Sequence, residues 1–179
     1  IIPAAANLAQ AFNSDITPAL EMVKMHMNSY QLSAKEAQKV TDMIAVTSKN
    51  TAADLPRLAE GFKYVGASGK ALGVPMETVY AMLGKMNDNG LIGSTAGTGL
   101  NQMFESMKDF KKRGKLENLI GKVTDEKGNL QDMVSIVERL KGVTDKMGNA
   151  DKAGVLKAIF GVQGGRAANT LLNGSIEDL

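Results

Sequence analysis

Apolar residues recur three or four positions apart along most of the chain, and this spacing constrains the fold more than any other feature. Residues separated by three and four positions lie on one face of an α-helix. The longest series run from Leu55 to Leu72 and from Leu130 to Met147, and shorter ones occupy 16–27, 40–47 and 79–86. Strand-like alternation of useful length is missing. The sequence therefore predicts an all-α fold, a bundle of about seven to nine short to medium helices.

Glycine and proline mark the turns that we expect between these helices. Gly73 ends one predicted helix and Pro75 opens the next, because the residue before proline avoids helical angles. The glycine-rich stretches 90–99 and 161–165 lack the Lys-Ser/Thr pair of a phosphate-binding loop. We expect them to form turns followed by helices whose small faces pack closely. The residues assigned to these turns are Gly73, Pro75, Gly90, Gly93, Gly97, Gly128, Gly161, Gly164 and Gly165.

Two helix starts carry clear capping signals. Ser33 and Glu36 have the spacing of a capping box, in which two side chains satisfy free backbone amides of the first turn. Pro56 has no N–H and is comfortable only in a first turn, so the helix around it is expected to begin near Asp54.

Two further starts are predicted from short polar segments. Thr17 stands before Pro18 and is expected to cap a helix whose first residue is that proline. Residues 125–129 form a predicted polar turn, after which Asn129 or a neighbour is expected to cap a helix that starts at Leu130.

The chain divides in sequence character near its middle. Residues 111–128 are charged, contain three glycines and carry only a short apolar group. We expect a linker or a short helix there, between a helical core region at 1–110 and a C-terminal helical subdomain at 129–179. The chain begins at Ile1 without an initiator methionine, so we expect it to be a piece of a longer protein.

The amino-acid composition limits the kinds of catalytic and metal-binding site that the chain can form. There is no cysteine and a single histidine, His26, so thiol catalysis, thiolate metal sites and a histidine metal cluster are not expected. His26 is interpreted as an ordinary residue of a helix surface or interface. We therefore predict no catalytic, cofactor-binding or metal-binding residues and no small-molecule substrate. The 11 methionines are interpreted as helix filler or, alternatively, as surfaces that repack against different neighbours.

One basic cluster stands out although the formal net charge is only +2. It is a candidate for contact with nucleic acid or another partner. The simpler interpretation is a solvated helix end, where cations are favoured near the C-terminal pole of the helix dipole. Its members are Lys108, Lys111, Lys112, Arg113 and Lys115.

Several motifs follow one another in a distinctive order. The first are Leu58-Ala59-Glu60-Gly61-Phe62, Ala71-Leu72-Gly73-Val74-Pro75 and Asn89-Gly90-Leu91-Ile92-Gly93. They are followed by Asp125-Glu126-Lys127-Gly128-Asn129, Ile159-Phe160-Gly161 and Gly164-Gly165-Arg166-Ala167-Ala168. In this order they resemble the core region of phage tail tape measure proteins over about residues 33–173. Gly99 and Pro56 depart from the family pattern.

The resemblance implies a long, mostly helical structural protein inside the tail tube of a phage or prophage. Its length would set tail length during assembly, and it would leave ahead of the DNA during ejection. Implied partners are the tail tube protein, tail assembly chaperones, tail-tip proteins, further copies of itself and the passing DNA. The implied locations are the tail lumen and, during assembly, the host cytoplasm.

Two other functions are weighed against this structural role. A cell-wall hydrolase would need two carboxylates across a cleft, one with a raised pKa. The candidate carboxylates, Glu60, Glu77, Glu105 and Glu138, each lie among lysines on a predicted amphipathic helix, which favours solvated faces. The basic cluster favours a module that contacts DNA or a membrane surface. No apolar run is long enough to predict a membrane span.

Overall fold

The computed structural model describes residues 1–173 and confirms the all-α prediction. Within this range nine α-helices and one short 3₁₀ helix form, and the only β-type pairing is an isolated bridge between Thr124 and Leu130. The elements are α1 (Ile2–Ala11), α2 (Ile16–Tyr30), η1 (Ala34–Glu36), α3 (Ala37–Asn50), α4 (Leu55–Ala71), α5 (Met76–Asp88), α6 (Gly93–Lys108), α7 (Phe110–Ile120), α8 (Met133–Thr144) and α9 (Asn149–Leu172).

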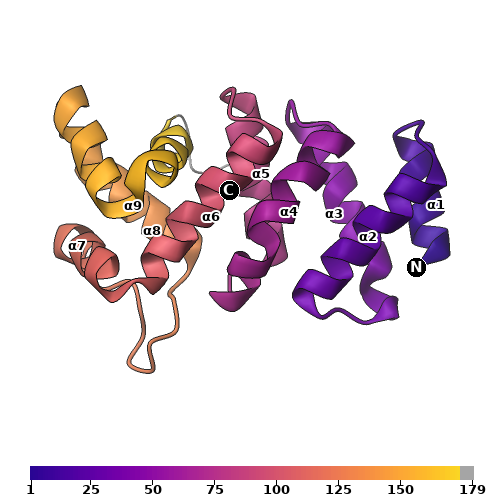
Figure 1. Cartoon of the computed structure of the whole chain (residues 1–179), viewed down its shortest axis with the longest axis horizontal. Coiled ribbons are helices and arrows are strands. Elements are labelled where there is room, and N and C mark those ends of the chain that lie inside the picture. Colours follow the sequence, from indigo (N-terminus) through magenta and orange to yellow (C-terminus); the bar gives the residue numbers. More distant parts are fainter. Residues whose placement is uncertain (174–179) are drawn as a thin grey trace.

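The helices follow one another along the long axis of the molecule (Figure 1). The pair α1 and α2 lies at one end, and α7, α8 and α9 lie at the other. In the middle, α6 packs against α4 on one side and against α9 on the other. This central triplet joins segments distant in sequence, so it links the two ends of the molecule into one packed body.

Local signals placed several helix ends correctly. Ser33 and Glu36 form the predicted capping box, and the Asp54 carboxylate accepts a hydrogen bond from the backbone N–H of Arg57 at 2.9 Å. Gly73 adopts the left-handed region, with φ 73°, between α4 and α5. Because these signals act within one turn of the chain, they hold in the folded molecule.

Two predicted starts are wrong. Helix α2 begins at Ile16, and Pro18 lies inside its first turn rather than following a Thr17 cap. Helix α8 begins at Met133, with Asp132 accepting from the backbone of Ser135, and the predicted helix start at Leu130 lies in the β-bridge instead.

The Asp125 side chain explains why the chain is not yet helical at Leu130. It accepts hydrogen bonds from the backbone N–H groups of Lys127 and Asn129, at 2.9 and 2.8 Å, and from the Asn129 side-chain amide. Such local bonds compete with helical ones and favour a turn. Gly128, with φ 84°, completes the turn.

The segment 111–128 divides between two structures. Its first part belongs to α7, which packs against α6, α8 and α9, and its second part forms the turn before α8. The division of the chain into a 1–110 region and a 129–179 subdomain stays a prediction, and residues 174–179 lie outside the described part.

The buried core is aliphatic and rich in methionine. Eight of the 11 methionines are buried, and Met25, Met43 and Met147 are half-buried. This supports the interpretation of methionine as interior filler over that of a repacking surface. Among residues 1–173, no helix has both the length and the apolar character needed to cross a membrane. The buried methionines are Met22, Met27, Met76, Met82, Met86, Met103, Met107 and Met133.

Candidate functional site

A line of glycines sets the spacing of the central helices, and we call Gly61, Gly97, Gly99 and Gly164 the glycine seam. A Cβ atom added to Gly97 would lie 2.1 Å from the carbonyl oxygen of Gly61. A Cβ at Gly99 would lie 3.0 Å from the Cβ of Ala167. The backbones of α4 and α6 therefore approach so closely that a side chain at Gly97 would not fit between them, and α6 and α9 come close at Gly99 and Gly164.

Gly161 breaks α9 into two arms. Its φ of 77° and ψ of −174° are not helical. The side-chain oxygen of Gln102, on α6, accepts a hydrogen bond from the backbone N–H of Gly164 at 2.8 Å, so it caps the start of the second arm. Gly165 then lies against the backbone of Lys157 in the first arm, where a Cβ would come within 3.1 Å. Beyond the bend, the second arm packs on α6, where a Cβ at Gly99 would meet Ala167 and one at Gly164 would meet Met103.

The other turn glycines occupy several kinds of position. Gly90 and Gly128 have positive φ in turns, and Gly93, with φ 51°, is the first residue of α6. Gly97, Gly164 and Gly165 lie inside helices and not in turns, because their missing side chains serve helix contact rather than chain reversal.

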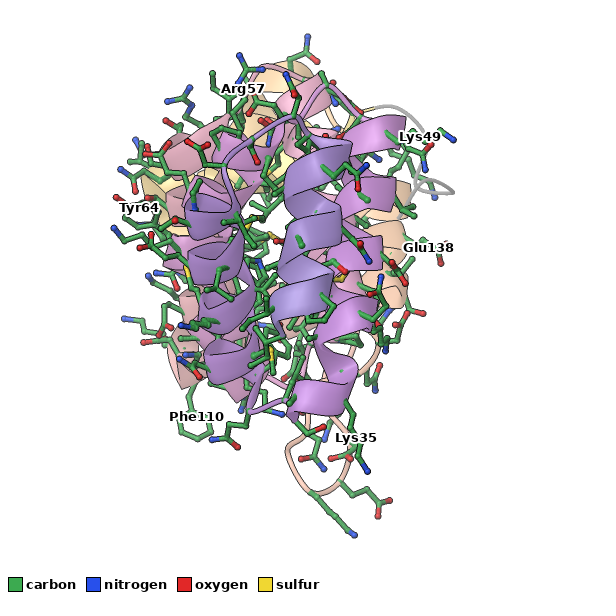
Figure 2. The ribbon with its side chains drawn as sticks, turned by 90° about the vertical axis from the view of Figure 1, so that its right-hand side faces the viewer. Lys35, Lys49, Arg57, Tyr64, Phe110 and Glu138 are labelled. Atoms are coloured by element: carbon green, nitrogen blue, oxygen red, sulfur yellow. The ribbon has the colours of Figure 1, made fainter. Side chains whose placement is uncertain are left out.

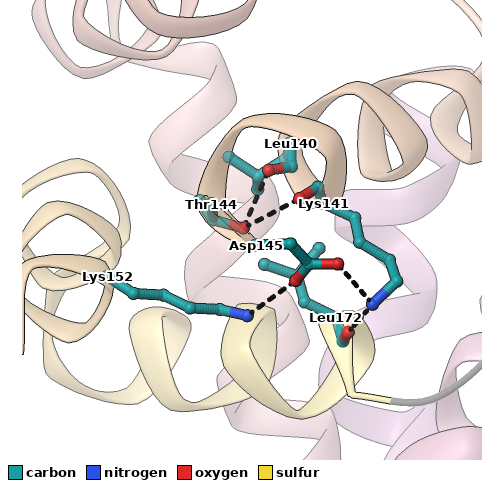
Figure 3. A network of polar contacts seen from close by, with 6 residues as sticks. All are labelled: Leu140, Lys141, Thr144, Asp145, Lys152 and Leu172. Carbon is teal, nitrogen blue, oxygen red and sulfur yellow. Dashed lines mark hydrogen bonds and ion pairs between the residues drawn. The ribbon is translucent and has the colours of Figure 1, made fainter. Parts of the chain in front are cut away.

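An ion-pair network fastens α8 to both ends of α9 (Figure 3). Lys141 lies 2.9 Å from the Asp145 carboxylate and also donates to the carbonyl of Leu172, at the end of α9. Lys152, in the first turns of α9, lies 3.3 Å from the same carboxylate. Lys141 thus satisfies a carbonyl that the helix end leaves free.

His26 is buried, so the expectation of a helix-surface position is wrong, and the residue lies instead at an interface between helices. Its ring stacks on Phe62 of α4 with centroids 3.9 Å apart, and its Nε2 contacts the Tyr80 hydroxyl of α5. Its Nδ1 faces the carbonyl of Met22, which can only accept, so Nδ1 carries the proton and Nε2 accepts from Tyr80. Burial lowers the pKa of His26 to about 4. A neutral histidine with both nitrogens bonded joins three helices.

The basic cluster occupies a corner between two helices. Lys108 ends α6 and pairs with Glu105 at 2.5 Å. Lys111, Lys112 and Arg113 lie in the first turn of α7, the positive end of its dipole. The expected C-terminal position is therefore wrong for these three, because the chain turns at Asp109 and starts a new helix.

Two contacts complete this corner. The Lys115 ammonium donates to the carbonyl of Ala158 at 3.4 Å, and the Arg113 guanidinium lies 4.8 Å from the ring centroid of Phe110. Phe110 exposes 82% of its surface and was missed by the sequence reasoning. The charged run around it gave no sign that this side chain would be left outside the core.

The candidate carboxylates are placed on different elements. Glu77 of α5 pairs with Lys39 of α3 at 2.5 Å, and this contact lowers the pKa of Glu77. Glu105 pairs with Lys108. A general acid would need the opposite shift. In the described residues, no group of three or more histidines and carboxylates is placed to hold a metal ion.

The chain matches known phage proteins over almost its whole length. Residues 1–161 match the family model described as phage-related minor tail protein. The chain is 28% identical over 95% of its length to the "Probable tape measure protein" of Escherichia phage P2, and covers 21% of that protein. It is 26% identical over 89% of its length to the "Tape measure protein" of Pneumococcus phage Dp-1, and covers 14% of it.

No solved structure matches the chain. It spans about a fifth and a seventh of the two curated relatives. The family model covers well over half of the chain, including α1 to α8 and the first arm of α9 up to the Gly161 bend. The chain therefore belongs to the phage-related minor tail protein family.

Proposed function

We propose that the chain is a folded segment of a tape measure protein, which sets tail length and scaffolds assembly of the tail tube. The observation that supports this is the near end-to-end alignment with tape measure proteins of two phages that infect different hosts. This proposal gives the chain the role of the relatives' whole proteins, of which the chain covers 21% and 14%.

The packing favours a role in positioning. The glycine seam and the network at Lys141 tie α4, α6, α8 and α9 into a unit with closely set backbones. Such a unit can hold a fixed shape while other proteins assemble around it. We propose the tail tube protein, tail assembly chaperones and tail-tip proteins as partners, together with further copies of the chain. The proposed locations are the tail lumen and, before assembly, the host cytoplasm, with release during ejection.

The experiment is an in-frame deletion of the 179-residue segment from the gene of the whole protein, followed by electron microscopy of the tails. Shorter tails are expected. A matched control replaces the segment by an unrelated helical sequence of equal length, which should restore more of the tail length than the deletion. Tails of unchanged length after the deletion would remove this segment from the measuring function.

The proposed role is structural and not enzymatic. The relatives' names point to a structural protein, and the Lys39 partner lowers rather than raises the pKa of Glu77. Zymography of the purified chain on peptidoglycan tests this directly. Clear lysis that is lost when Glu77 or Glu105 becomes glutamine would assign hydrolase activity instead.

A further inference from the structure

The turn between α6 and α7 places an exposed aromatic ring inside a group of cations. We call Phe110, Lys111, Lys112 and Arg113 the basic corner. Phe110 is the most exposed of the large apolar side chains in the described part of the chain, at 82%. Figure 2 shows it at the lower edge of the molecule, away from the packed helices. This ring lies outside the buried core that residues 1–173 form.

The cations of the basic corner are poorly neutralised from inside the molecule. Lys111 and Lys112 form no ion pair with another residue of the range 1–173. Both lie in the first turn of α7, whose dipole presents positive charge, and Asp109 supplies the cap. The Asp109 carboxylate already occupies the helix end, so an external anionic surface would interact mainly with the Lys111 and Lys112 side chains.

A single exposed ring beside several cations suits some anionic partners better than others, and three are compared: duplex DNA, single-stranded nucleic acid and an acidic lipid bilayer. Insertion of a ring into duplex DNA unstacks a base step, and this cost is repaid only when the bent DNA wraps around more protein surface than one projecting corner offers. Proteins that bind single strands use a groove with several stacking aromatics, whereas Phe110 is one ring on a projecting corner. A bilayer with acidic lipids offers anionic headgroups to the lysines and an apolar layer just beneath them to the ring.

We propose that the basic corner binds the surface of an anionic lipid bilayer. Phe110 enters the boundary between headgroups and acyl chains, while Lys111, Lys112 and Arg113 contact the headgroups. The stacking of the Arg113 guanidinium on the Phe110 ring keeps a cation beside the inserted side chain. This peripheral binding needs no membrane-spanning helix, and it does not rest on the tape measure role.

The chain contains no tryptophan, so Phe110→Trp gives a single fluorescent reporter at the proposed contact. Its emission should shift to shorter wavelength with phosphatidylcholine vesicles that contain about one third phosphatidylserine, and not with phosphatidylcholine alone. Flotation of the unmodified chain with the same vesicles checks binding without the reporter. Raising the salt from about 0.05 M to about 0.5 M should release both proteins.

Two pairs of charge variants distinguish binding at the basic corner from a nonspecific effect of the net charge of the chain. Lys111→Gln with Lys112→Gln should weaken vesicle binding by about 30-fold, about fivefold for each charge. Lys49→Gln with Lys63→Gln changes net charge equally at exposed positions of α3 and α4 and should leave binding within about twofold. Phe110→Ser should lower binding by about tenfold, with an unchanged circular dichroism spectrum.

Several outcomes would overturn the proposal. These are absence of binding to the acidic vesicles at low salt, an equal loss in the Lys49 and Lys63 control, and full binding by Phe110→Ser. A larger emission change with single- or double-stranded oligonucleotides than with vesicles, at equal phosphate concentration, would make nucleic acid the ligand of this corner and would equally refute the lipid assignment.

Discussion

Replacement of Gly97 by alanine tests whether the central helices are as close as the structure places them. The added Cβ would lie 2.1 Å from the Gly61 carbonyl oxygen and 2.9 Å from its Cα. Both atoms belong to the α4 backbone, so no side chain can rotate to make room. Helices α4 and α6 must separate by about 1 Å to bring the shortest contact back to 3.0 Å.

Two opposing effects determine the size of the change. Alanine is a better helix former than glycine, which favours the variant by about 1 kcal/mol. Overpacking a filled core costs about 1–3 kcal/mol and occasionally more. A backbone clash at this distance belongs at the upper end, because it moves α6 and with it the contacts to α9. We expect a net loss of about 2 kcal/mol in the free energy of unfolding, and a melting temperature lower by about 4–8 °C.

Urea and thermal unfolding followed by circular dichroism at the helical band measure this loss. The matched control is Gly142→Ala, a glycine of α8 around which no atom lies within 4 Å of an added Cβ. It should gain about 0.5–1 kcal/mol, because only the helix propensity changes. If Gly97→Ala were as stable as Gly142→Ala, the close approach of α4 and α6 would be refuted.

Three further changes probe other parts of the fold by unfolding measurements. The pKa of His26 is lowered from 6.5 to about 4, so stability should fall by up to about 3 kcal/mol as pH decreases through this window. The variant His26→Asn should lose that slope, and a retained slope would assign it elsewhere. Gly161→Ala should cost about 2 kcal/mol because φ is 77°. Asp132→Ala should cost about 1 kcal/mol, whereas Asp15→Ala, whose side chain makes no capping bond, should change little.

Structural features that depend on residues close together in the chain could be predicted from the sequence. The apolar series from Leu55 to Leu72, the Asp54 cap and the turn at Gly73 depend on residues close together in the chain, and the structure has them in place. The start at Leu130 failed for a local reason too, because side-chain bonds from Asp125 prevailed over the apolar spacing.

Structural features that depend on residues far apart in the chain could not be predicted from the sequence. The environment of His26 comes from Phe62 and Tyr80, which lie on other helices, and nothing next to His26 signals their approach. The same holds for the contact of Gly97 with Gly61. A glycine predicted from sequence as a turn can equally be a point of helix contact, and only the tertiary arrangement separates the two.

The folded state also bears on how such a segment could contribute to tail length. A helix advances about 1.5 Å per residue, so 179 residues in one continuous helix would span about 270 Å. The longest helix, α9, has 24 residues and is bent at Gly161, so no helix in the described part exceeds about 36 Å. To form a rod, the chain would have to separate the glycine seam and expose Phe62 and Phe160, which are fully buried.

We therefore expect deletion of the segment to shorten tails by far less than 270 Å. A loss near that value would show that these helices straighten inside the tail.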